Sequence, residues 1–252
     1  MEIFDCNALF GFWPKRKLAA DIDSVRELAR DHGITGMMLA SIRGIFDDFE
    51  LGNEETYEIC RNEPNLIPVM TLNPCRYLGV EAEIGKWRER GLRIFRFFPD
   101  FQNWPYSYAP FQRILRHLAS QNTAESQSLI ILPARVGGHG KHGVISEIGL
   151  IAGVYPKLRF LITGAYYGNL AEAIVAAQDH PNLMLETHLV NSPEGIRVLV
   201  EHVGADRVVF GTEMPLNYPG AALGAVTGAD LTEECRTAIL AGNARRILEV
   251  IP

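Results

Sequence analysis

The residues best suited to chemistry in this sequence stand at the ends of short apolar segments. Glu213 follows VVFGT, His188 follows LMLET, and Asp5 lies within the opening IFDCN. A carboxylate can act as a general base, and an unperturbed imidazole titrates near neutral pH, so these side chains suit proton transfer. We predict Glu213, His188 and Asp5 as catalytic residues. A structural ion pair or hydrogen bond is the alternative role for each.

Arg96 is the least ordinary charge, because it stands inside the apolar run IFRFFP. Burying an unpaired guanidinium is costly, so Arg96 needs a partner. Asp5 or Glu213 could pair with it, or an anionic substrate group could occupy its planar fork. We predict a substrate-binding set of five residues, each with a structural alternative: Arg96, Arg135, Arg43, Asn7 and Tyr166.

Other candidate motifs are weaker. His139 and His142 have HxxH spacing in the glycine-rich segment 137–143, which favours a solvated, flexible loop. An unusual metal centre that these histidines build with His188 and Glu213 is the alternative. The acidic stretch 44–52 reads as a solvated loop. The sequence contains no GxSxG or GxxxxGK[ST] motif, which argues against serine hydrolases and nucleotide hydrolases.

The composition is that of a globular protein. The chain has 252 residues, 47% of them hydrophobic, and a formal charge of −6. The net negative charge does not indicate a basic surface for nucleic acid or an anionic membrane, so a small molecule is the expected partner. The four cysteines lack CxxC spacing, and the start lacks a basic segment followed by an apolar run. We expect a cytoplasmic protein with reduced thiols, and the sequence leaves open whether it forms a homo-oligomer.

Apolar β-branched runs alternate with amphipathic stretches along the whole chain, which is typical of repeated βα units. The runs predict eight strands, at Glu2–Cys6, Gly36–Ala40, Leu66–Leu72, Leu92–Phe98, Leu129–Leu132, Leu158–Ile162, Leu183–Thr187 and Val208–Gly211. Eight helices are predicted between and after them, at Asp21–His32, Glu54–Arg61, Val80–Arg90, Pro110–Gln121, Ile145–Val154, Leu170–Gln178, Pro193–Val203 and Thr232–Leu248. The fold class is therefore α/β, a single (β/α)₈ TIM barrel domain over residues 1–252, in which the candidate residues gather at the carboxyl ends of the strands.

Four segments give the chain a family resemblance. IFDCNALFG, RGLRIFRFFP, GADRVVFGTEMP and the closing NARRIL resemble the amidohydrolase-related family of the metal-dependent hydrolase superfamily. The resemblance implies a (β/α)₈ barrel, one or two divalent metals that activate water, and an eighth-strand Asp that accepts a proton. Its members hydrolyse amides, lactones and esters, and some decarboxylate or hydrate small carboxylic acids.

The sequence departs from the family pattern at the metal ligands. Asn7 and Leu9 occupy the positions of the paired first-strand histidines, and Glu213 replaces the eighth-strand Asp. ILPAR and LITGAYYG also lack the histidines of the fifth and sixth strands. Strand alternation predicts that Asp5, Asn7 and Leu9 face the same side, where the ligands would have been. A catalytic zinc takes about three protein ligands, so we expect no metal cofactor.

These observations favour an amidohydrolase-like hydrolase or lyase that acts on a small carboxylate- or lactone-type substrate without the family's metal. Arg96 and Arg135 would hold the anion, and Glu213 would activate water or abstract a proton with help from His188. A catalytically silent barrel that binds a metabolite or a protein partner is the alternative. Buried ionisable groups around an open pocket would favour the enzyme, and apolar filling of the mouth around Leu9 would favour the silent barrel.

Overall fold

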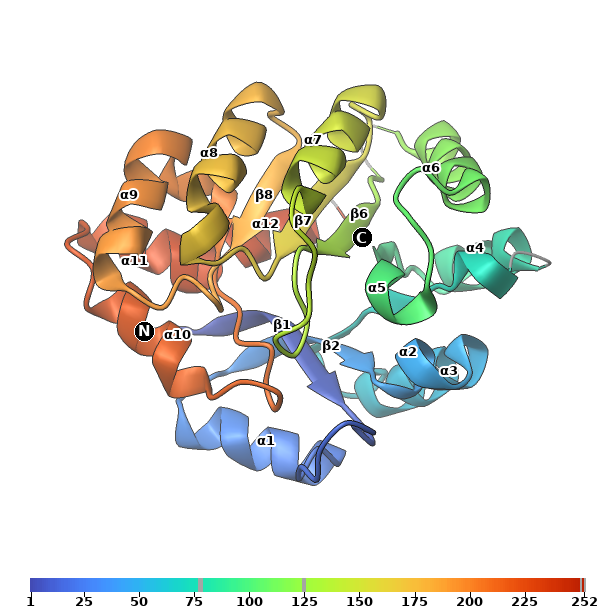
Figure 1. The fold of residues 1–252 in the computed structure, drawn as a ribbon. Coiled ribbons are helices and arrows are strands. Elements are labelled where there is room, and N and C mark those ends of the chain that lie inside the picture. The colour runs from blue at the N-terminus through green and yellow to red at the C-terminus, as the bar shows by residue number, and fades with distance from the viewer. Residues whose placement is uncertain (77–78, 124–125, 250, 252) are drawn as a thin grey trace.

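Parallel strands form a ring with helices around it (Figure 1). The structure is a computed structural model that describes residues 1–252 except 77–78, 124–125, 250 and 252. The strands of the described residues are β1 (Phe4–Phe10), β2 (Gly36–Ser41), β3 (Leu66–Pro68), β4 (Met70–Thr71), β5 (Ile94–Arg96), β6 (Leu129–Pro133), β7 (Arg159–Thr163), β8 (Leu183–Glu186) and β9 (Val208–Val209).

The strands follow their chain order around the ring, and every pair is parallel. β3 and β4 are halves of one expected strand, separated at Val69, whose N–H donates to the Leu39 carbonyl at 2.9 Å. The ring closes where Cys6 N donates to Phe210 O at 2.9 Å and Leu9 N donates to Met214 O at 2.8 Å. The predicted α/β barrel is therefore confirmed.

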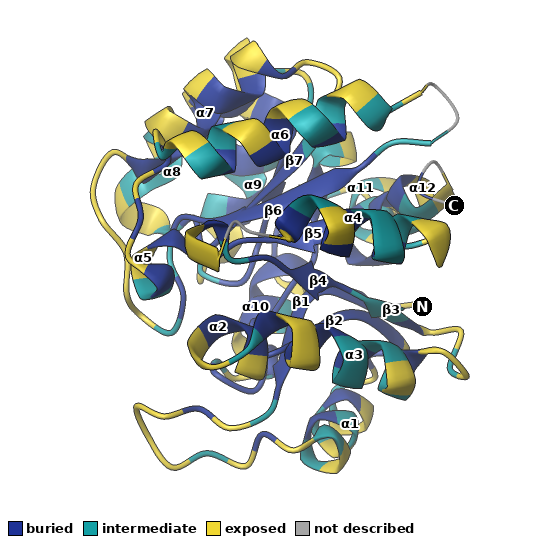
Figure 2. Cartoon of the chain, turned by 90° about the vertical axis from the view of Figure 1, so that its right-hand side faces the viewer, coloured by how far each residue is buried: buried dark blue, intermediate teal, exposed yellow. Residues whose placement is uncertain are grey.

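The helices lie outside the ring and turn their buried faces toward it (Figure 2). They are α1 (Ile22–Asp31), α2 (Arg43–Phe46), α3 (Phe49–Cys60), α4 (Val80–Glu89), α5 (Pro99–Gln102), α6 (Ala109–Gln121), α7 (Val144–Val154), α8 (Leu170–Asp179), α9 (Pro193–Val203), α10 (Pro219–Thr227), α11 (Glu233–Thr237) and α12 (Asn243–Glu249). Short helical turns are η1 (Pro74–Arg76), η2 (Tyr167–Asn169), η3 (Ala205–Arg207) and η4 (Ala238–Gly242). None of the helices in the described residues combines the length and the apolar character needed to cross a bilayer.

The helix expected over Thr232–Leu248 forms as one continuous helical run, from α11 through the π-helical turn η4 to α12. One local expectation is wrong. Most of the acidic stretch 44–52 lies in α2 and α3, with Asp47 and Asp48 in the break between them. Asp48 caps α3 by accepting hydrogen bonds from the backbone N–H groups of Glu50 and Leu51. Short acidic side chains favour loops, but they also favour the N-cap position of a helix, which Asp48 occupies here.

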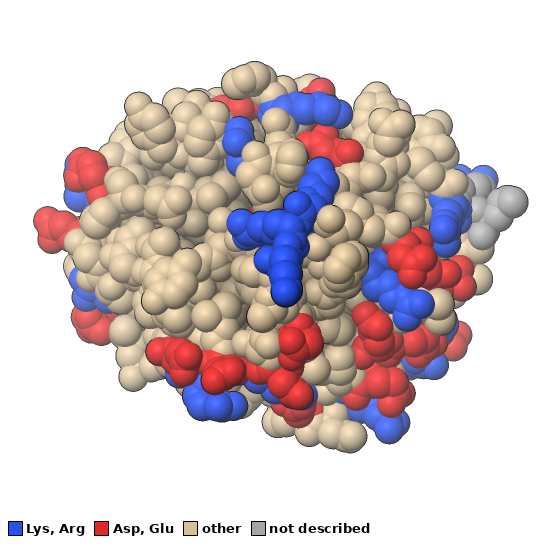
Figure 3. Space-filling view, turned by 60° about the horizontal axis from the view of Figure 1, so that its bottom comes forward, with Lys and Arg blue, Asp and Glu red and all other residues tan. Residues whose placement is uncertain are grey.

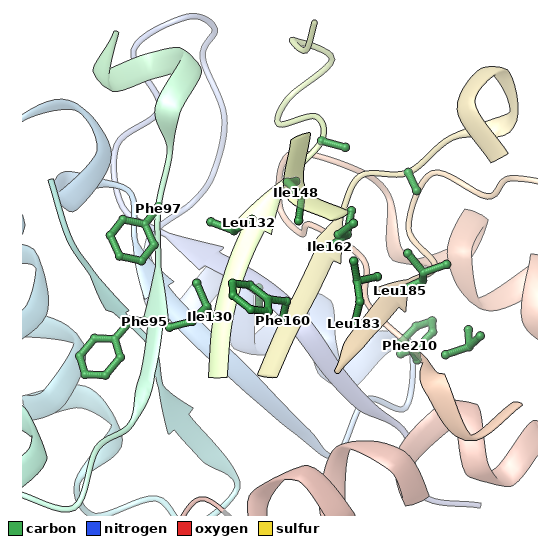
Figure 4. Packing of buried hydrophobic residues seen from close by; sticks show 14 of the residues in the cluster. Phe95, Phe97, Ile130, Leu132, Ile148, Phe160, Ile162, Leu183, Leu185 and Phe210 are labelled. Carbon is green, nitrogen blue, oxygen red and sulfur yellow. The ribbon is translucent and has the colours of Figure 1, made fainter. Parts of the chain in front are cut away.

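Apolar side chains fill two layers, one on each face of the ring. The outer layer, between strands and helices, includes Ile130, Leu132, Phe160, Ile162 and Phe210 (Figure 4). The inner layer fills the barrel with the alternate residues of the same strands, among them Leu129, Ile131, Leu161, Met184 and Val209. Strands with both faces buried read as continuous apolar runs, which is why these segments stand out in the sequence.

β1 departs from simple alternation. Its register against β2 shifts between Asp5 and Ala8, so three steps along β1 match two along β2. As a result Leu9 belongs to the same inner cluster as Phe4 and Cys6. Leu9 therefore faces the inner side, as predicted. The strict alternation that would put Asp5 on that side with it is wrong, because an extra residue in a strand reverses the relative facing of the residues before and after it.

Candidate active site

An imidazole held between two carboxylates occupies the carboxyl ends of β8 and β9. Glu186 ends β8, His188 lies two residues later, and Glu213 lies in the segment after β9. His188 Nδ1 is 2.5 Å from Glu186 Oε2, and His188 Nε2 is 3.5 Å from Glu213 Oε2. All three side chains are buried. The fold thus brings together two predicted catalytic residues, Glu213 and His188, with Glu186 as a third member.

The two carboxylates change the charge expected for His188. Burial is the largest single effect and lowers the pKa of the imidazole, but the charges of Glu186 and Glu213 outweigh it and raise the pKa to about 10. An unperturbed imidazole titrates near neutral pH. Between the two carboxylates, His188 is instead an imidazolium at neutral pH. Its chemistry at neutral pH is therefore that of a proton donor or a fixed positive charge.

Glu213 has an unusual backbone conformation and one free oxygen. Its φ is 54°, in the left-handed region that non-glycine residues rarely adopt. Glu213 Oε2 accepts from the backbone N–H of Gly137 at 3.0 Å and from Asn217 Nδ2 at 2.6 Å. Oε1 is buried and has no hydrogen-bond partner among the described residues. A carboxylate fixed through one oxygen with the other free is suited to accept a proton.

Asp5 and Asn7 form a second polar layer beside this cluster. Asn7 Nδ2 lies 3.2 Å from Glu186 Oε2 and 3.3 Å from His188 Nδ1. Asp5 accepts from the Thr212 N–H at 3.0 Å, from Thr212 Oγ1 at 2.5 Å and from the Asn7 N–H at 2.8 Å. Burial raises the pKa of Asp5 to about 6. These contacts tie β1 to the segment after β9, a positioning role.

Arg96 ends β5 and is only 1% exposed. Its Nε and Nη2 have no hydrogen-bond partner within the described part of the chain, and the guanidinium carbon lies 4.8 Å from the centre of the Phe98 ring. Among the residues that the structure describes, no direct ion pair joins Arg96 to Asp5 or Glu213, the two protein partners considered for it. Burial lowers the pKa of Arg96 to about 10, against the opposing charges of Glu213, Glu186 and Asp5. Its two unpaired donors suit an anionic group.

A pocket of about 560 Å³ opens next to this cluster, and Arg135, Gly138, Tyr166 and Asn217 are among its lining residues. The Arg135 guanidinium lies 4.2 Å from the centre of the Tyr166 ring. Glu213, His188 and Arg96 do not line the pocket, but Asn217 does, and it donates to Glu213. Asn217 therefore links the pocket to the cluster.

The predicted binding residue Arg43 lies away from this pocket. Its guanidinium pairs with Asp47 at 3.1 Å and approaches Glu55 at 3.8 Å. All three side chains belong to the segment of α2 and α3 or its connection. The fold therefore places Arg135 and Tyr166 together at the pocket and Asn7 beside the buried cluster, whereas Arg43 pairs with acidic residues of its own segment.

Aromatic side chains from the mouth loops cover the cluster. The Trp13 ring lies 5.2 Å from Phe46 and 5.6 Å from Phe101, and Phe101 lies 5.9 Å from the His139 ring. A Cβ at Gly137 would stand 2.8 Å from Trp13 Cζ2, so the loop 137–143 packs directly on this cover. Lys15, Arg16, Lys17 and Lys141 on the two loops are exposed, and Figure 3 shows basic side chains grouped on one face of the molecule.

The strand ends in the sequence place Glu186 among the candidate positions without a specific role, and no sequence pattern points to Asn217. Glu186 carries a detectable signal, because a carboxylate at the end of the apolar run LMLE requires a buried partner. Its packing is tight: a Cβ at Gly211 would stand 2.5 Å from Glu186 Oε1. Asn217 had no comparable signal, since its contact with Glu213 depends on the turn after β9.

The donors at the mouth do not fit a divalent-metal site. His188 Nε2 and Glu213 Oε1 are free, but no third donor joins them, and the described residues contain no group of three or more His, Cys, Asp or Glu arranged to hold a metal. Catalytic zinc takes about three protein ligands. His139 contacts Lys15, at 3.5 Å between the two nitrogens, and Phe101, so the alternative centre with His188 and Glu213 is not assembled in this structure.

Comparisons with known proteins agree with this architecture. A family model described as Amidohydrolase matches residues 12–250. A search of curated proteins finds no match.

Solved structures share the fold at low sequence identity. An uncharacterized TIM-barrel protein from Bordetella bronchiseptica has a TM-score of 0.80 at 14% identity, covering 100% of this chain and 99% of that chain. A 2,6-dihydroxybenzoate decarboxylase from Rhizobium has a TM-score of 0.76 at 14% identity, with 100% and 99% covered. A dihydroxybenzoic acid decarboxylase from Polaromonas, with bound manganese and 2-nitroresorcinol, has a TM-score of 0.72 at 14% identity, with 100% and 98% covered.

Proposed function

Because the chain belongs to the amidohydrolase family, we propose that it is a hydrolase or lyase acting on a small carboxylate- or lactone-type substrate without the family's metal. The decarboxylases among the structural relatives act on small aromatic carboxylates, which supports this substrate class. The observation that carries the proposal is the buried set of Glu186, His188 and Glu213 beside the unpaired guanidinium of Arg96.

Arg96 supplies the anchor in this proposal. Its free Nε and Nη2 donors would form a bidentate pair with a carboxylate of the substrate, which removes the cost of leaving them unpaired. Arg135 at the adjacent pocket would attract the same anion. The substrate reaches Arg96 when the loop 137–143 shifts, since Arg96 and Glu213 are closed to solvent with the loop in place.

For a lactone or ester, Glu213 takes a proton from a water molecule while the oxygen of that water attacks the carbonyl carbon of the substrate. The ring or ester C–O bond breaks, and the leaving oxygen takes the proton of the His188 imidazolium. Glu186 holds His188 through Nδ1, so Nε2 points toward the reacting groups. The proton on Glu213 then returns to His188, and the two residues are restored to their starting charges.

The charges at the mouth support chemistry without a metal. Arg96 and the His188 imidazolium place two positive charges among Glu186, Glu213 and Asp5, in the part of the barrel where the family's metal would stand. Metal analysis of protein purified without chelator tests this directly. Stoichiometric zinc or manganese would contradict it, and trace amounts with retained activity would support it.

Replacing Glu213 by Gln tests the catalytic assignment. A panel of lactones, esters and hydroxybenzoates first identifies a substrate. On it, Glu213→Gln should lower kcat by about 100-fold or more with little change in KM, because the base is lost and the anion contact stays. The matched control is Glu83→Gln, which replaces a buried carboxylate outside the mouth that accepts from Trp87. Equal rates for Glu213→Gln and wild type would refute the assignment.

One observation favours a second candidate, the catalytically silent barrel that binds a metabolite or protein partner. Leu9 is fully buried in the inner cluster with Trp13, Val136 and Leu216, so apolar side chains fill that side of the mouth. A ligand that binds the pocket and is recovered unchanged, with no turnover across the panel, would support this candidate over the enzyme.

A further inference from the structure

A second pocket, of about 450 Å³, lies at the opposite end of the barrel from the mouth. Its lining residues precede or begin strands, among them Gln127 before β6, Arg159 at the start of β7, Asn182 before β8 and Arg207 before β9. This amino-terminal face of a β/α barrel ordinarily serves stability rather than chemistry. A pocket lined by charged residues at this face is therefore not explained by the chemistry of the mouth.

Four cations converge on this pocket: Lys157, Arg159, Arg207 and Arg246. Asp206 is its one acidic lining residue, and within the described residues no ion pair involves any of the four. The chain as a whole carries a net charge of −6, so this cluster of positive charge is opposite in sign to the net charge of the chain. This concentration of positive charge is therefore local.

The arginines are held by neutral oxygens. Arg159 Nε donates to Gln127 Oε1 at 2.5 Å, and Arg246 Nη2 donates to the Asp206 carbonyl at 2.7 Å. Arg207 donates from Nε and Nη2 to the Val203 carbonyl, at 3.2 and 2.9 Å, and from Nη1 to the Ala177 carbonyl. Such bonds fix the guanidinium groups without cancelling their charge. Burial and the neighbouring Arg246 lower the pKa of Arg159, as expected when like charges are held together.

Leu158, Met184 and Ile247 add buried apolar side chains to the wall of the pocket, beside the polar Gln127 and Asn182. Cations fixed above an apolar floor suit a compact anion with an organic body, and guanidinium groups match phosphate oxygens in geometry. We propose that this pocket binds a small phosphorylated molecule, with Arg159 and Arg246 on its phosphate groups, Lys157 at the rim and Arg207 adding positive charge from its backbone-bonded position. The proposal is independent of the function assigned to the mouth.

Calorimetric titration of the full chain with inorganic pyrophosphate tests the proposal. Wild type should bind one pyrophosphate, and the double variant Lys157→Ala/Arg246→Ala should raise Kd by about 10-fold or more, since each lost cation removes charge-assisted contacts. The control is Arg30→Ala/Arg61→Ala, which removes two exposed arginines elsewhere and should leave Kd within about threefold, because only diffuse attraction changes.

Two further measurements keep the result interpretable. Lys157→Ala alone removes an exposed side chain with no hydrogen bond among the described residues, so it leaves folding intact and should still weaken binding. Titration with citrate separates phosphate from carboxylate recognition. Absence of pyrophosphate binding, equal weakening in the control pair, or tighter binding of citrate would each overturn the proposal.

Discussion

At the scale of single residues, His188 determines the electrostatics of the mouth. Its two ring nitrogens face Glu186 and Glu213, and the paired carboxylates raise its pKa to about 10 despite burial. Arg96 adds a second buried cation close to the same carboxylates. Each of these charges would be costly alone in the barrel, so the cluster is stable only as a set.

This coupling predicts a pH-dependent contribution to stability. The folded pKa of about 10 lies above the usual 6.5, so the contribution of His188 is complete below about pH 6.5 and is lost as pH rises through 10. The difference in free energy of unfolding between wild type and His188→Gln should therefore shrink by about 2 kcal/mol or more between pH 6 and pH 10. Urea denaturation at several pH values measures it.

His202→Gln is the control for this series, because His202 is exposed on α9. Its effect on the free energy of unfolding should not follow the same pH window. A difference between wild type and His188→Gln that stays constant from pH 6 to pH 10 would show that the imidazole is not held as a cation.

Glu186 is the positioning residue for His188. Glu186→Gln removes one of the two negative charges and should lower the pKa of His188, because an amide cannot stabilise the imidazolium. NMR titration of the imidazole resonances measures the change, and Glu83→Gln should leave the titration unaltered. An unchanged pKa of His188 in Glu186→Gln would contradict the positioning role.

At the scale of elements, two loops and one strand irregularity shape the site. The register shift in β1 carries Asn7 to Glu186 and His188 while Leu9 fills the barrel. The loop 137–143 reaches across the mouth, where the Gly137 N–H donates to Glu213. The cover is therefore part of the arrangement that holds the proposed base.

Gly137 offers a test of this contact. An alanine Cβ there would meet Trp13 Cζ2 at 2.8 Å, whereas a Cβ at Gly138 would have open space. Both glycines have positive φ, 53° and 84°, so the two alanine variants share the backbone strain. Gly137→Ala should cost about 1–3 kcal/mol more than Gly138→Ala in urea denaturation, because overpacking is added to strain. Equal destabilisation would mean that Trp13 does not seal the mouth against Gly137.

At the scale of the whole molecule, ring closure makes the two halves of the chain interdependent. Hydrogen bonds from Cys6 and Leu9 to the segment after β9 join the first strand to the last. Glu2 pairs with Arg245 across the same seam. The inner cluster draws on strands around the whole ring, so it cannot form from either half alone.

We therefore predict one cooperative unfolding transition. Far-UV circular dichroism and fluorescence of the buried Trp13, Trp87 and Trp104 should give urea midpoints that agree within about 0.2 M, since the three rings lie in different parts of the barrel. An earlier fluorescence transition with intact secondary structure would show that the mouth or one helical layer unfolds separately.

The sequence by itself determined the elements and their order, because period and apolar runs are local properties. It also indicated that His188 and Glu213 meet, since the carboxyl ends of parallel strands converge, and that Arg96 is buried. The split at Val69, the π-turn η4 and the cap at Asp48 adjusted element boundaries without changing the barrel.

Only the tertiary structure decided how those residues are used. The bulge in β1 placed Leu9 on the same side as Phe4 and Cys6, Glu186 and Glu213 raised the pKa of His188, and Trp13 covered the mouth from a distant loop. The basic pocket at the far end joins side chains from Lys157 to Arg246 that share no local pattern. Each depends on segments far apart in the chain, whose approach is set by the closed packing of the barrel rather than by any local period.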